Sequence, residues 1–347
     1  MSLTDLSYWV RKSIPFVILF FLVFLIFFYS IKLLFILMTP APVTTIYTNP
    51  IFGKINPPEL SQATSSAGFN FTLDTVEGVP VTATSAANVY FIPDTPVRFG
   101  YQDKISLIAK NFGIDTSTVQ YTLSGREAIF QDGGSTLKID IGNFNFKYDG
   151  DIAVSSLQVG SVTKSETDIV NDATNFLKSV GRYPQELATG TTNVIYLTYD
   201  LSQGNFVNVE RAGQASAVEV DFYRPSVNGI DIVTPKFFNS QNYVVMSYSS
   251  DTPTVIKAQI NFFEKDDSQF GVYPVISGDA AWAELKSGKG LLVAGRAGVK
   301  NISIKKMGLY YLDPDTYQPY LEPVYVFIGD NDFVAYVPAV NGNYLVK

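Results

Sequence analysis

The chain has 347 residues and a formal net charge of −7, and it contains neither histidine nor cysteine. It therefore cannot form a Ser-His-Asp triad, a cysteine nucleophile, an ordinary zinc site or a disulfide. Hydrophobic residues make up 46% of the chain and aromatic residues 14%, which is too much for a disordered protein. We expect a folded protein whose chemistry is restricted to carboxylates, Ser-Lys pairs or none.

Residues 14–38 form an apolar segment long enough to cross a membrane. From Ile14 to Ile31 there is no charged residue, and six further apolar residues, ending at Met38, follow Lys32. As a helix, 25 residues span roughly 37 Å, more than the hydrocarbon core of a bilayer, which is about 30 Å thick. We predict a transmembrane anchor over residues 13–38 and a cytoplasmic tail over residues 1–12.

The flanking charges predict the orientation of this anchor. Arg11 and Lys12 immediately precede it, and the next cation after Lys32 is Lys54. The positive-inside rule places the N-terminus in the cytoplasm and the C-terminal part outside. We expect the side chain of Lys32 to snorkel to the membrane interface; the alternative is that it pairs with an acidic group in a partner's membrane helix.

A cleaved signal peptide is the alternative interpretation of the same segment. Signal peptides have apolar cores of about 7 to 15 residues followed by a cleavage site of small residues. The apolar run is longer here, and the sequence MTPAPVTT that ends it offers a poor site. We therefore favour an uncleaved anchor and a single-pass protein of the cell membrane.

The exterior part is acidic. When Asp5, Arg11, Lys12 and Lys32 are left out, it carries 22 basic and 31 acidic residues, a net charge of −9. Such a surface repels nucleic acid and anionic lipid heads, so we expect neither as a ligand.

Residues 39–87 are rich in proline, serine and threonine. The prolines are Pro40, Pro42, Pro50, Pro57, Pro58 and Pro80. Proline at this density stiffens a chain into extended segments, so we predict an extracytoplasmic spacer. The stretches FNFTLDTV and NVYFIP near its end have the composition of short strands.

The first predicted helix after the spacer, about residues 101–112, belongs to a unit that we assign to residues 88–160. Apolar residues recur in it at helical spacing, and Gly113 stands where a left-handed residue ends a helix. The strand-like runs TVQYTL, EAIFQ, TLKIDI and FNFKY follow, separated by turn dipeptides. This pattern predicts a helix packed on an antiparallel sheet.

The second predicted helix, about residues 166–180, belongs to a unit that we assign to residues 161–268. Ser165 is a candidate N-cap with Asp168 three residues later, and an apolar stripe ends at Gly181. The runs NVIYLTYD, FVNVER, AVEVDFYR, YVVMSYS and TVIKAQINFFE then predict a longer antiparallel meander.

The third predicted helix, about residues 279–286, belongs to a unit that we assign to residues 269–347. The strand-like runs LLVAG, ISIKKMGLYYL, PVYVFIG and FVAYVPAV follow it. PVYVFIG is apolar on both faces, which predicts a central strand covered on both sides. Three helices, each with a trailing antiparallel sheet, predict an α+β fold of repeated helix-plus-sheet units.

Three stretches of this last unit carry a resemblance to a known family. They are YPVISGDAAWAELKSGKG (273–290), GLYYLDPDTYQPYLEPVYVF (308–327) and FVAYVPAV (333–340). An Ala-Trp-x-x-Leu-x-x-Gly helix end, a Leu-Tyr-Tyr strand and a Pro-Val-aromatic strand before the last hairpin resemble the extracytoplasmic domains of the YycH and YycI family. The resemblance is best over residues 271–340.

The resemblance has implications for function. Members of that family are bacterial single-pass proteins, accessory to a two-component system, that associate with an essential sensor histidine kinase of cell-wall homeostasis and restrain it. The resemblance therefore implies a binding or regulatory role, with contacts along the membrane helix and the exterior domains. It brings no catalytic residues to carry over.

Short acidic sequences are the remaining candidates for a site. They are Asp149-Gly150-Asp151, Asp266-Asp267, Asp313-Pro314-Asp315 and Asp330-Asn331-Asp332. Each resembles a fragment of a calcium loop, but none has the full EF-hand pattern, and each lies at a predicted turn, where Asp and Asn are common. Glycosidase carboxylates must face each other about 5 to 9.5 Å apart, which no sequence shows. We predict no catalytic residue, metal or cofactor.

We therefore expect a bacterial, membrane-anchored binding protein that is not an enzyme. In the first hypothesis it modulates a sensor histidine kinase or another envelope protein, because it binds one conformation of that partner better than another. In the second it binds cell-wall glycan or peptide as an envelope anchor protein without a regulatory role. An enzyme that uses a carboxylate pair ranks third. The sequence identifies no partner-binding residue.

Overall fold

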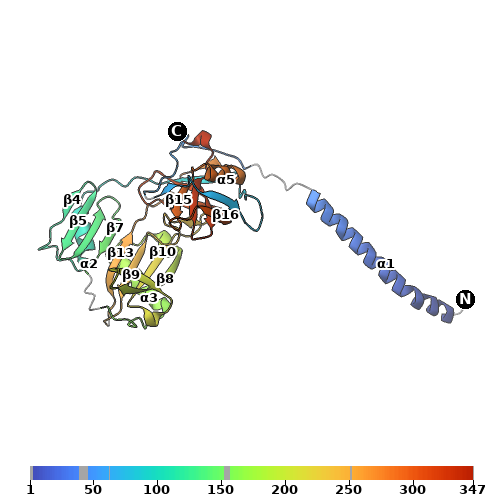
Figure 1. The fold of residues 1–347 in the computed structure, drawn as a ribbon, viewed down its shortest axis with the longest axis horizontal. Coiled ribbons are helices and arrows are strands. Elements are labelled where there is room, and N and C mark those ends of the chain that lie inside the picture. Colours follow the sequence, from blue (N-terminus) through green and yellow to red (C-terminus); the bar gives the residue numbers. More distant parts are fainter. Residues whose placement is uncertain (1–2, 39–45, 62, 152–156, 251, 347) are drawn as a thin grey trace. The chain divides into compact units, whose positions relative to one another are not determined.

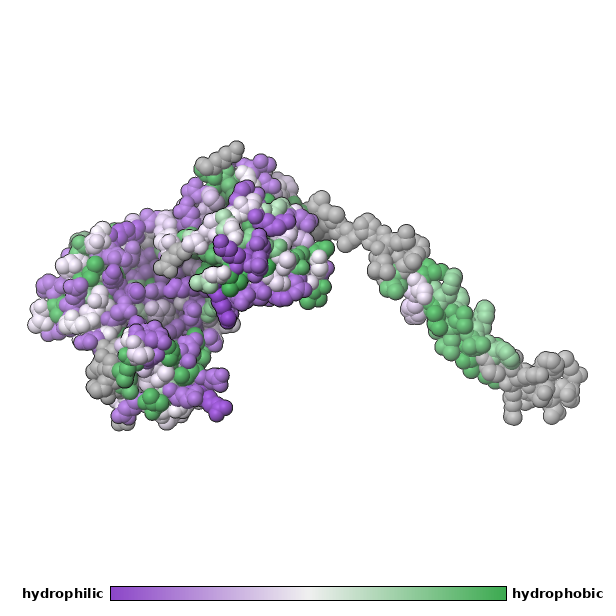
Figure 2. Space-filling view, in the orientation of Figure 1, coloured by the Kyte–Doolittle hydropathy of each residue, from purple (hydrophilic) through white to green (hydrophobic). Residues whose placement is uncertain are grey.

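The chain divides into two units, residues 1–46 and residues 47–347. Helix α1 (Leu3–Met38) forms most of the first unit (Figure 1). The computed structural model describes residues 3–38, 46–61, 63–151, 157–250 and 252–346. Within α1, the stretch Phe16–Leu33 is long and apolar enough to cross a membrane. Its side chains, except that of Leu25, are exposed, and Figure 2 shows that most of the surface of this stretch is apolar. A helix that is apolar on all sides fits a membrane anchor.

The helix is longer at its N-terminal end than we predicted. It begins at Leu3, so that residues 3–12 of the predicted tail are helical. The sequence LTDLSYWVRKS, which precedes the apolar segment, contains neither Gly nor Pro, so nothing in it breaks a helix.

The described part of residues 47–347 forms two nine-stranded sheets, and in one of them every strand pair is antiparallel. This antiparallel sheet has the strand order β4 (Thr122–Ser124), β5 (Glu127–Asp132), β6 (Ser135–Asp140), β7 (Phe146–Asp149), β13 (Thr254–Ile260), β12 (Tyr243–Ser247), β10 (Ala217–Tyr223), β8 (Thr191–Asp200), β9 (Asn205–Val209). Three helices, α2 (Tyr101–Asn111), α3 (Glu166–Val180) and α4 (Gln185–Thr189), pack with it into one apolar core. The helices therefore cover one face of this sheet, which we call the helix-bearing face, and we call the opposite face the helix-free face.

The second sheet contains parallel as well as antiparallel pairs, and we call it the mixed sheet. Its strand order is β1 (Thr64–Ser65), β15 (Leu291–Ala294), β18 (Val334–Pro338), β17 (Tyr320–Gly329), β16 (Asn301–Leu312), β11 (Ile232–Val233), while β2 (Asn70–Leu73) pairs with β16, and β3 (Ala86–Phe91) joins β17 to β14 (Phe270–Pro274). Strands β2 and β11 run parallel to β16. Helix α5 (Gly278–Lys286) packs on this sheet through Ala281 and Leu285.

Helix α3 shows how local sequence sets these elements. The Ser165 hydroxyl accepts a hydrogen bond from the Asp168 amide at 3.2 Å, and Gly181 ends the helix with a φ of 72°. Between these caps, Ile169, Ala173, Leu177 and Val180 are buried against the antiparallel sheet. The predicted helix over residues 166–180 is confirmed at both ends, because cap chemistry and apolar periodicity agree there.

Strand β17 is buried on both faces, as its sequence predicted. Tyr325 and Phe327 face the core that contains α5, whereas Val324 and Val326 face a second cluster with Tyr336. The strand lies between β16 and β18, and this central position explains why residues 323–328 are apolar on both faces, although Glu322 near the start of the strand is buried too.

The prediction of three repeated helix-plus-sheet units is not confirmed. Strands from residues 88–160 and 161–268 lie in one sheet, since β7 pairs with β13, and α2 and α3 share one core. Strand β11 crosses to the mixed sheet. The structure is a mixed α/β, sheet-rich domain that follows one N-terminal apolar helix. The periodicity of apolar residues predicts single helices and strands, whereas pairing between strands that are distant in sequence decides which strands share a sheet.

Parts of the predicted spacer pair with strands of the mixed sheet. Strand β1 pairs with β15, β2 pairs with β16, and Ile55 is 1% exposed beside Leu345. Pro50, Pro57, Pro58 and Pro80 therefore lie in the segments between short strands and bridges of a folded domain, where proline is tolerated. Residues 39–45 and 62 of this prediction lie outside the described residues.

Shortening Leu177 to alanine tests the shared core. Leu177 is fully buried, so Leu177→Ala should lower the free energy of unfolding by about 2–5 kcal/mol. Leu107→Ala in α2 is the matched control, because Leu107 is 50% exposed, and its cost should stay within about 0.5 kcal/mol. Urea denaturation of the full-length protein in detergent measures both, and equal losses would contradict the packing described here.

Candidate functional site

A row of polar side chains crosses the helix-free face of the antiparallel sheet. Each residue of this row lies opposite the next one on the neighbouring strand. The row consists of Lys138 on β6, Lys147 on β7, Gln259 on β13, Tyr243 on β12 and Asp221 on β10. Their strand neighbours point to the helix-bearing face and are buried and apolar. Because side chains alternate along a strand, one face of this sheet is core, and the other carries this polar row beside a smaller apolar cluster of Leu197, Ala217, Val245 and Ile256.

Two adjoining cavities lie along this row. Their volumes are about 510 Å³ and 330 Å³, and both are lined by Lys147, Gln259, Asn261 and Asp315. We call the two together the trough. Its far wall includes residues 315–317 of the loop that follows β16. Volumes of this size fall within the usual range for ligand sites, about 300–1,000 Å³.

A buried ion pair joins this wall to the antiparallel sheet. The Arg224 side chain follows β10 and is 1% exposed, and its Nε lies 3.1 Å from Oδ1 of Asp313, which is 3% exposed and follows β16. This contact is an ion pair that is not aligned as a hydrogen bond. The guanidinium also donates to the Phe263 carbonyl oxygen and lies 3.8 Å from the centre of the Phe262 ring.

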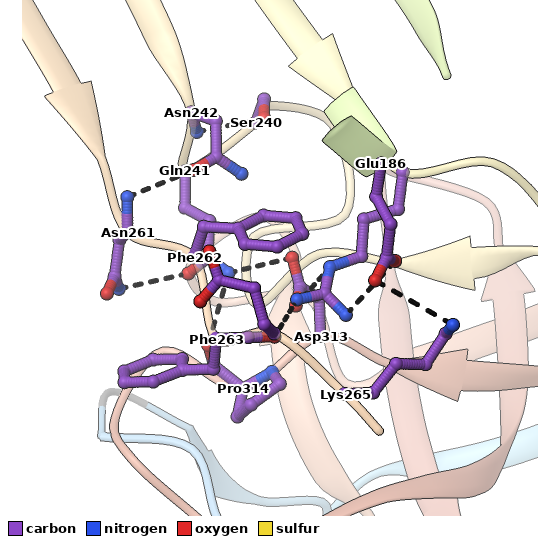
Figure 3. A network of polar contacts seen from close by, with 12 residues as sticks. Glu186, Ser240, Gln241, Asn242, Asn261, Phe262, Phe263, Lys265, Asp313 and Pro314 are labelled. Atoms are coloured by element: carbon purple, nitrogen blue, oxygen red, sulfur yellow. Dashed lines mark hydrogen bonds and ion pairs between the residues drawn. The ribbon is translucent and has the colours of Figure 1, made fainter. Parts of the chain in front are cut away.

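Glu186 and Lys265 complete the buried charge cluster (Figure 3). The two oxygens of Glu186 lie 3.7 Å from Nη1 of Arg224 and 3.7 Å from Nζ of Lys265. Lys265 also pairs with Asp267. Burial raises the pKa of Asp313, whereas Arg224 and Gln241 favour its ionised form. Opposite charges that balance one another make such burial tolerable.

Amide side chains tie the floor of the trough to its wall. Gln241 Nε2 donates to Asp313 Oδ2 at 2.9 Å and to the Pro314 carbonyl oxygen at 3.1 Å (Figure 3). Asn261 Nδ2 donates to Gln241 Oε1 at 3.2 Å and to the Asp315 carbonyl oxygen at 2.8 Å. Gln259 Nε2 donates to the Gln241 carbonyl oxygen at 2.9 Å. These bonds hold both sides of the trough in one arrangement.

One end of the trough carries a bridged arginine. Arg126 lies 3.0 Å from Asp94 and 3.4 Å from Asp140, and its Nη2 donates to the Thr95 carbonyl oxygen at 2.7 Å. These carboxylates raise the pKa of Arg126, which keeps it charged. The guanidinium is thus already satisfied by protein partners.

A carboxyl pair stands beside the other end. Asp221 is fully buried, and its Oδ2 accepts hydrogen bonds from Tyr223 Oη at 3.0 Å and from the Ser240 amide at 3.1 Å. Burial and the neighbouring Asp221 raise the pKa of Glu219 to about 7, against the opposing effect of Lys236 and Lys257. Glu219 therefore keeps its proton up to about neutral pH, beside the buried carboxyl group of Asp221.

The predicted acidic turns do not gather into a metal site. In the described part of the chain no three acidic side chains lie together as metal ligands. Asp266 Oδ1 accepts from the Ser268 amide, and Asp330 Oδ1 accepts from the Ser303 amide, each at 2.9 Å. The first bond lies within a turn, the second joins a turn to strand β16, and Asp313 belongs to the buried charge cluster.

The site residues that we predicted from the sequence lie on helix α1, and the trough was not predicted. Ile14 and Lys32 are exposed on α1, while the side chains of Arg11, Lys12 and Met38 lie outside the described residues. The signal for the trough was present in the runs STLKID, FNFKYD and TVIKAQI, in which charged or amide residues alternate with apolar ones. Which of these strands are neighbours is not visible in the sequence.

Comparison with known proteins gives no identification. No family model matches the chain, and no curated protein matches its sequence. An uncharacterized protein from Eubacterium rectale ATCC 33656 has 9% identity and a TM-score of 0.32, covering 77% of this chain and 87% of that one. The Bacillus megaterium YpeB C-terminal domain has 14% identity and a TM-score of 0.30, covering 70% and 93%. These similarities are weak and carry no argument about fold or function, and the resemblance to YycH and YycI is not confirmed.

The carboxyl pair makes stability depend on pH. The folded state holds a proton on Glu219 up to about pH 7, whereas the unfolded chain releases it near the ordinary value of 4.5. The free energy of unfolding should therefore fall as the pH rises between these values, by up to about 3 kcal/mol. Glu219→Gln should flatten this part of the profile. Urea denaturation from pH 4.5 to 8 tests it, and identical slopes for both proteins would refute the raised pKa of Glu219.

Proposed function

We propose that this protein is a membrane-anchored, extracytoplasmic binding protein without enzymatic activity, which regulates a membrane or envelope protein. The observation that carries the proposal is the combination of an apolar exposed helix with a folded domain that holds a rigid polar trough. The helix keeps the domain at the membrane, and the trough offers the domain a place to bind a partner.

The charges flanking the helix support the orientation. Arg11 and Lys12 precede the apolar stretch, and the domain that follows is acidic. By the positive-inside rule, the domain then lies on the extracytoplasmic side. The anchor stays attached in this proposal, because the apolar segment exceeds the length of a signal peptide core.

The kind of partner follows from the resemblance over residues 271–340. That stretch resembles accessory proteins of a sensor histidine kinase, so the partner we propose is such a kinase or another envelope protein. Regulation requires that the protein bind one conformation of the partner more tightly than another.

A second candidate function is cell-wall binding without regulation. Tyr317 supports it, because this residue lines the trough and is 41% exposed, and aromatic rings pack on the apolar faces of sugars. In this alternative, the anchor serves only to tether the wall to the membrane.

Crosslinking in cells separates the two functions. The full-length protein is compared with a version in which Ile14–Met38 is exchanged for an unrelated membrane helix, and bound partners are identified by mass spectrometry. The regulatory proposal predicts that a membrane sensor protein is crosslinked to the protein with its native helix and not to the version with the exchanged helix. Recovery of wall fragments alone from both versions would overturn regulation and favour wall binding.

Polar replacement of Leu19–Leu25 tests the anchor itself. Each charged or strongly polar residue at the centre of a membrane helix costs about 2–3 kcal/mol, so several together should prevent insertion. The variant should be released by carbonate extraction, while the unaltered protein stays in the membrane pellet. If the variant remained in the pellet, the proposed topology would be wrong.

A further inference from the structure

Two lysines of like charge lie directly opposite each other in the trough. Lys138 on β6 and Lys147 on β7 are Cα partners on the helix-free face. Like charges at such positions destabilise a sheet. Lys147 lies 3.7 Å from Asp149, at the limit of an ion pair, and Lys138 has no acidic partner among the described residues. This repulsion stands out in an exterior region with a net charge of −9.

The position of these lysines links them to a ligand. Lys138 lines the larger cavity, and Lys147 lines both. The Lys147 side chain is 52% exposed, so its ammonium group is accessible from the trough. An anion placed between the two ammonium groups would relieve their repulsion and form two charge-assisted hydrogen bonds.

The rest of the trough carries charges of both signs. Glu264 and Asp315 line it along with the lysines, and Lys236 lines its smaller cavity. A uniformly anionic polymer would therefore meet carboxylates as well as lysines. A neutral glycan would leave the repulsion between Lys138 and Lys147 unrelieved. A peptide, which carries isolated charges on a neutral backbone, fits both conditions.

Polar groups on the floor of the trough suit a peptide backbone. Gln259 Nε2 is committed to the Gln241 carbonyl oxygen, which leaves Gln259 Oε1 without a donor among the described residues. This oxygen is fixed in place and can accept an amide hydrogen. The hydroxyl of Tyr243, the next residue in the same row, likewise has no hydrogen-bond partner in the described part of the chain.

We infer that the trough binds an extended peptide segment of a partner protein, with one carboxylate of that segment held between Lys138 and Lys147. This inference rests on the proposed binding function and names the chemistry of its ligand. The peptide lies along the row from Lys138 toward Tyr243, and its backbone amides meet Gln259 Oε1. Affinity should fall as salt is added, because charge attraction in an open trough is screened.

The test is a selection of random seven-residue peptides on the full-length protein in detergent. We expect enriched peptides to share an Asp or Glu at one position. One of these peptides, and the same peptide with that residue changed to Asn or Gln, are then titrated against the protein. The amide version should bind at least about tenfold more weakly, the usual scale for loss of a charge-assisted contact.

Matched variants assign the binding to the lysine pair. Lys138→Gln with Lys147→Gln removes both charges, while Lys300→Gln with Lys306→Gln removes two exposed lysines that line neither cavity. The first double variant should lose at least about tenfold in affinity for the acidic peptide, and the control should not. The circular dichroism spectrum and the urea midpoint of each variant show whether it is folded.

Several outcomes would overturn the inference. They are the recovery of no peptide, the enrichment of peptides without an acidic position, or equal affinity of both double variants. If no peptide is selected, binding of a glycerol phosphate polymer or of peptidoglycan fragments is measured instead. Should such binding occur and be lost in the Lys138→Gln, Lys147→Gln variant, the trough would be assigned to the cell wall.

Crosslinking in cells distinguishes failure of this inference from failure of the proposed function. If the trough variant still captures the membrane partner, the partner binds elsewhere and the inference falls while the function stands. If the native protein selects acidic peptides but captures no envelope protein, regulation falls and the trough remains a peptide site.

Discussion

Arg224 and Asp313 are almost completely buried where the antiparallel sheet meets the loop after β16 of the mixed sheet. Each charge would be costly without the other, because removal of one partner from a buried pair leaves an uncompensated charge, at a cost of about 3–5 kcal/mol. The pair therefore restricts how the two sheets meet. Glu186 and Lys265 extend the same constraint to α4 and to the segment after β13. Stability alone does not require such a cluster, since apolar residues of similar volume serve as well, and its clearest consequence is a fixed geometry.

That fixed geometry gives the trough its shape. The oxygen atoms of Asp313 are shared between Arg224 and Gln241, and Gln241 in turn orients Asn261 and Gln259 on the floor. A binding site whose groups are already held in place loses less conformational entropy on binding than a mobile one. In the inferred peptide site, Lys138 and Lys147 would be the charged groups that select the ligand. In the proposed function, an uncleaved anchor would add a separate advantage, because it would confine the domain to the membrane and raise its effective concentration near a membrane partner.

Local features of the fold were predictable, and long-range ones were not. The helix over residues 166–180 followed from Ser165, Gly181 and an apolar stripe, and the central strand followed from apolar residues on both faces of PVYVFIG. The division into repeated units failed because β7 pairs with β13 across more than a hundred residues, a contact that no local pattern encodes. The trough was missed for the same reason. Lys138, Lys147 and Gln259 each look like ordinary exposed strand residues until their strands are placed side by side.

The most direct test of this constraint is a double-mutant cycle on Arg224 and Asp313, measured by urea denaturation together with hydrogen exchange in the full-length protein. Arg224→Met alone should lower the free energy of unfolding by about 3–5 kcal/mol and speed amide exchange at residues 313–315 and 241–242. Adding Asp313→Asn should recover more than about 1 kcal/mol of that loss, because no buried charge is then left without its partner. Additive losses, or exchange in the trough that Arg224→Met leaves unchanged, would contradict the view that this pair holds the binding surface in place.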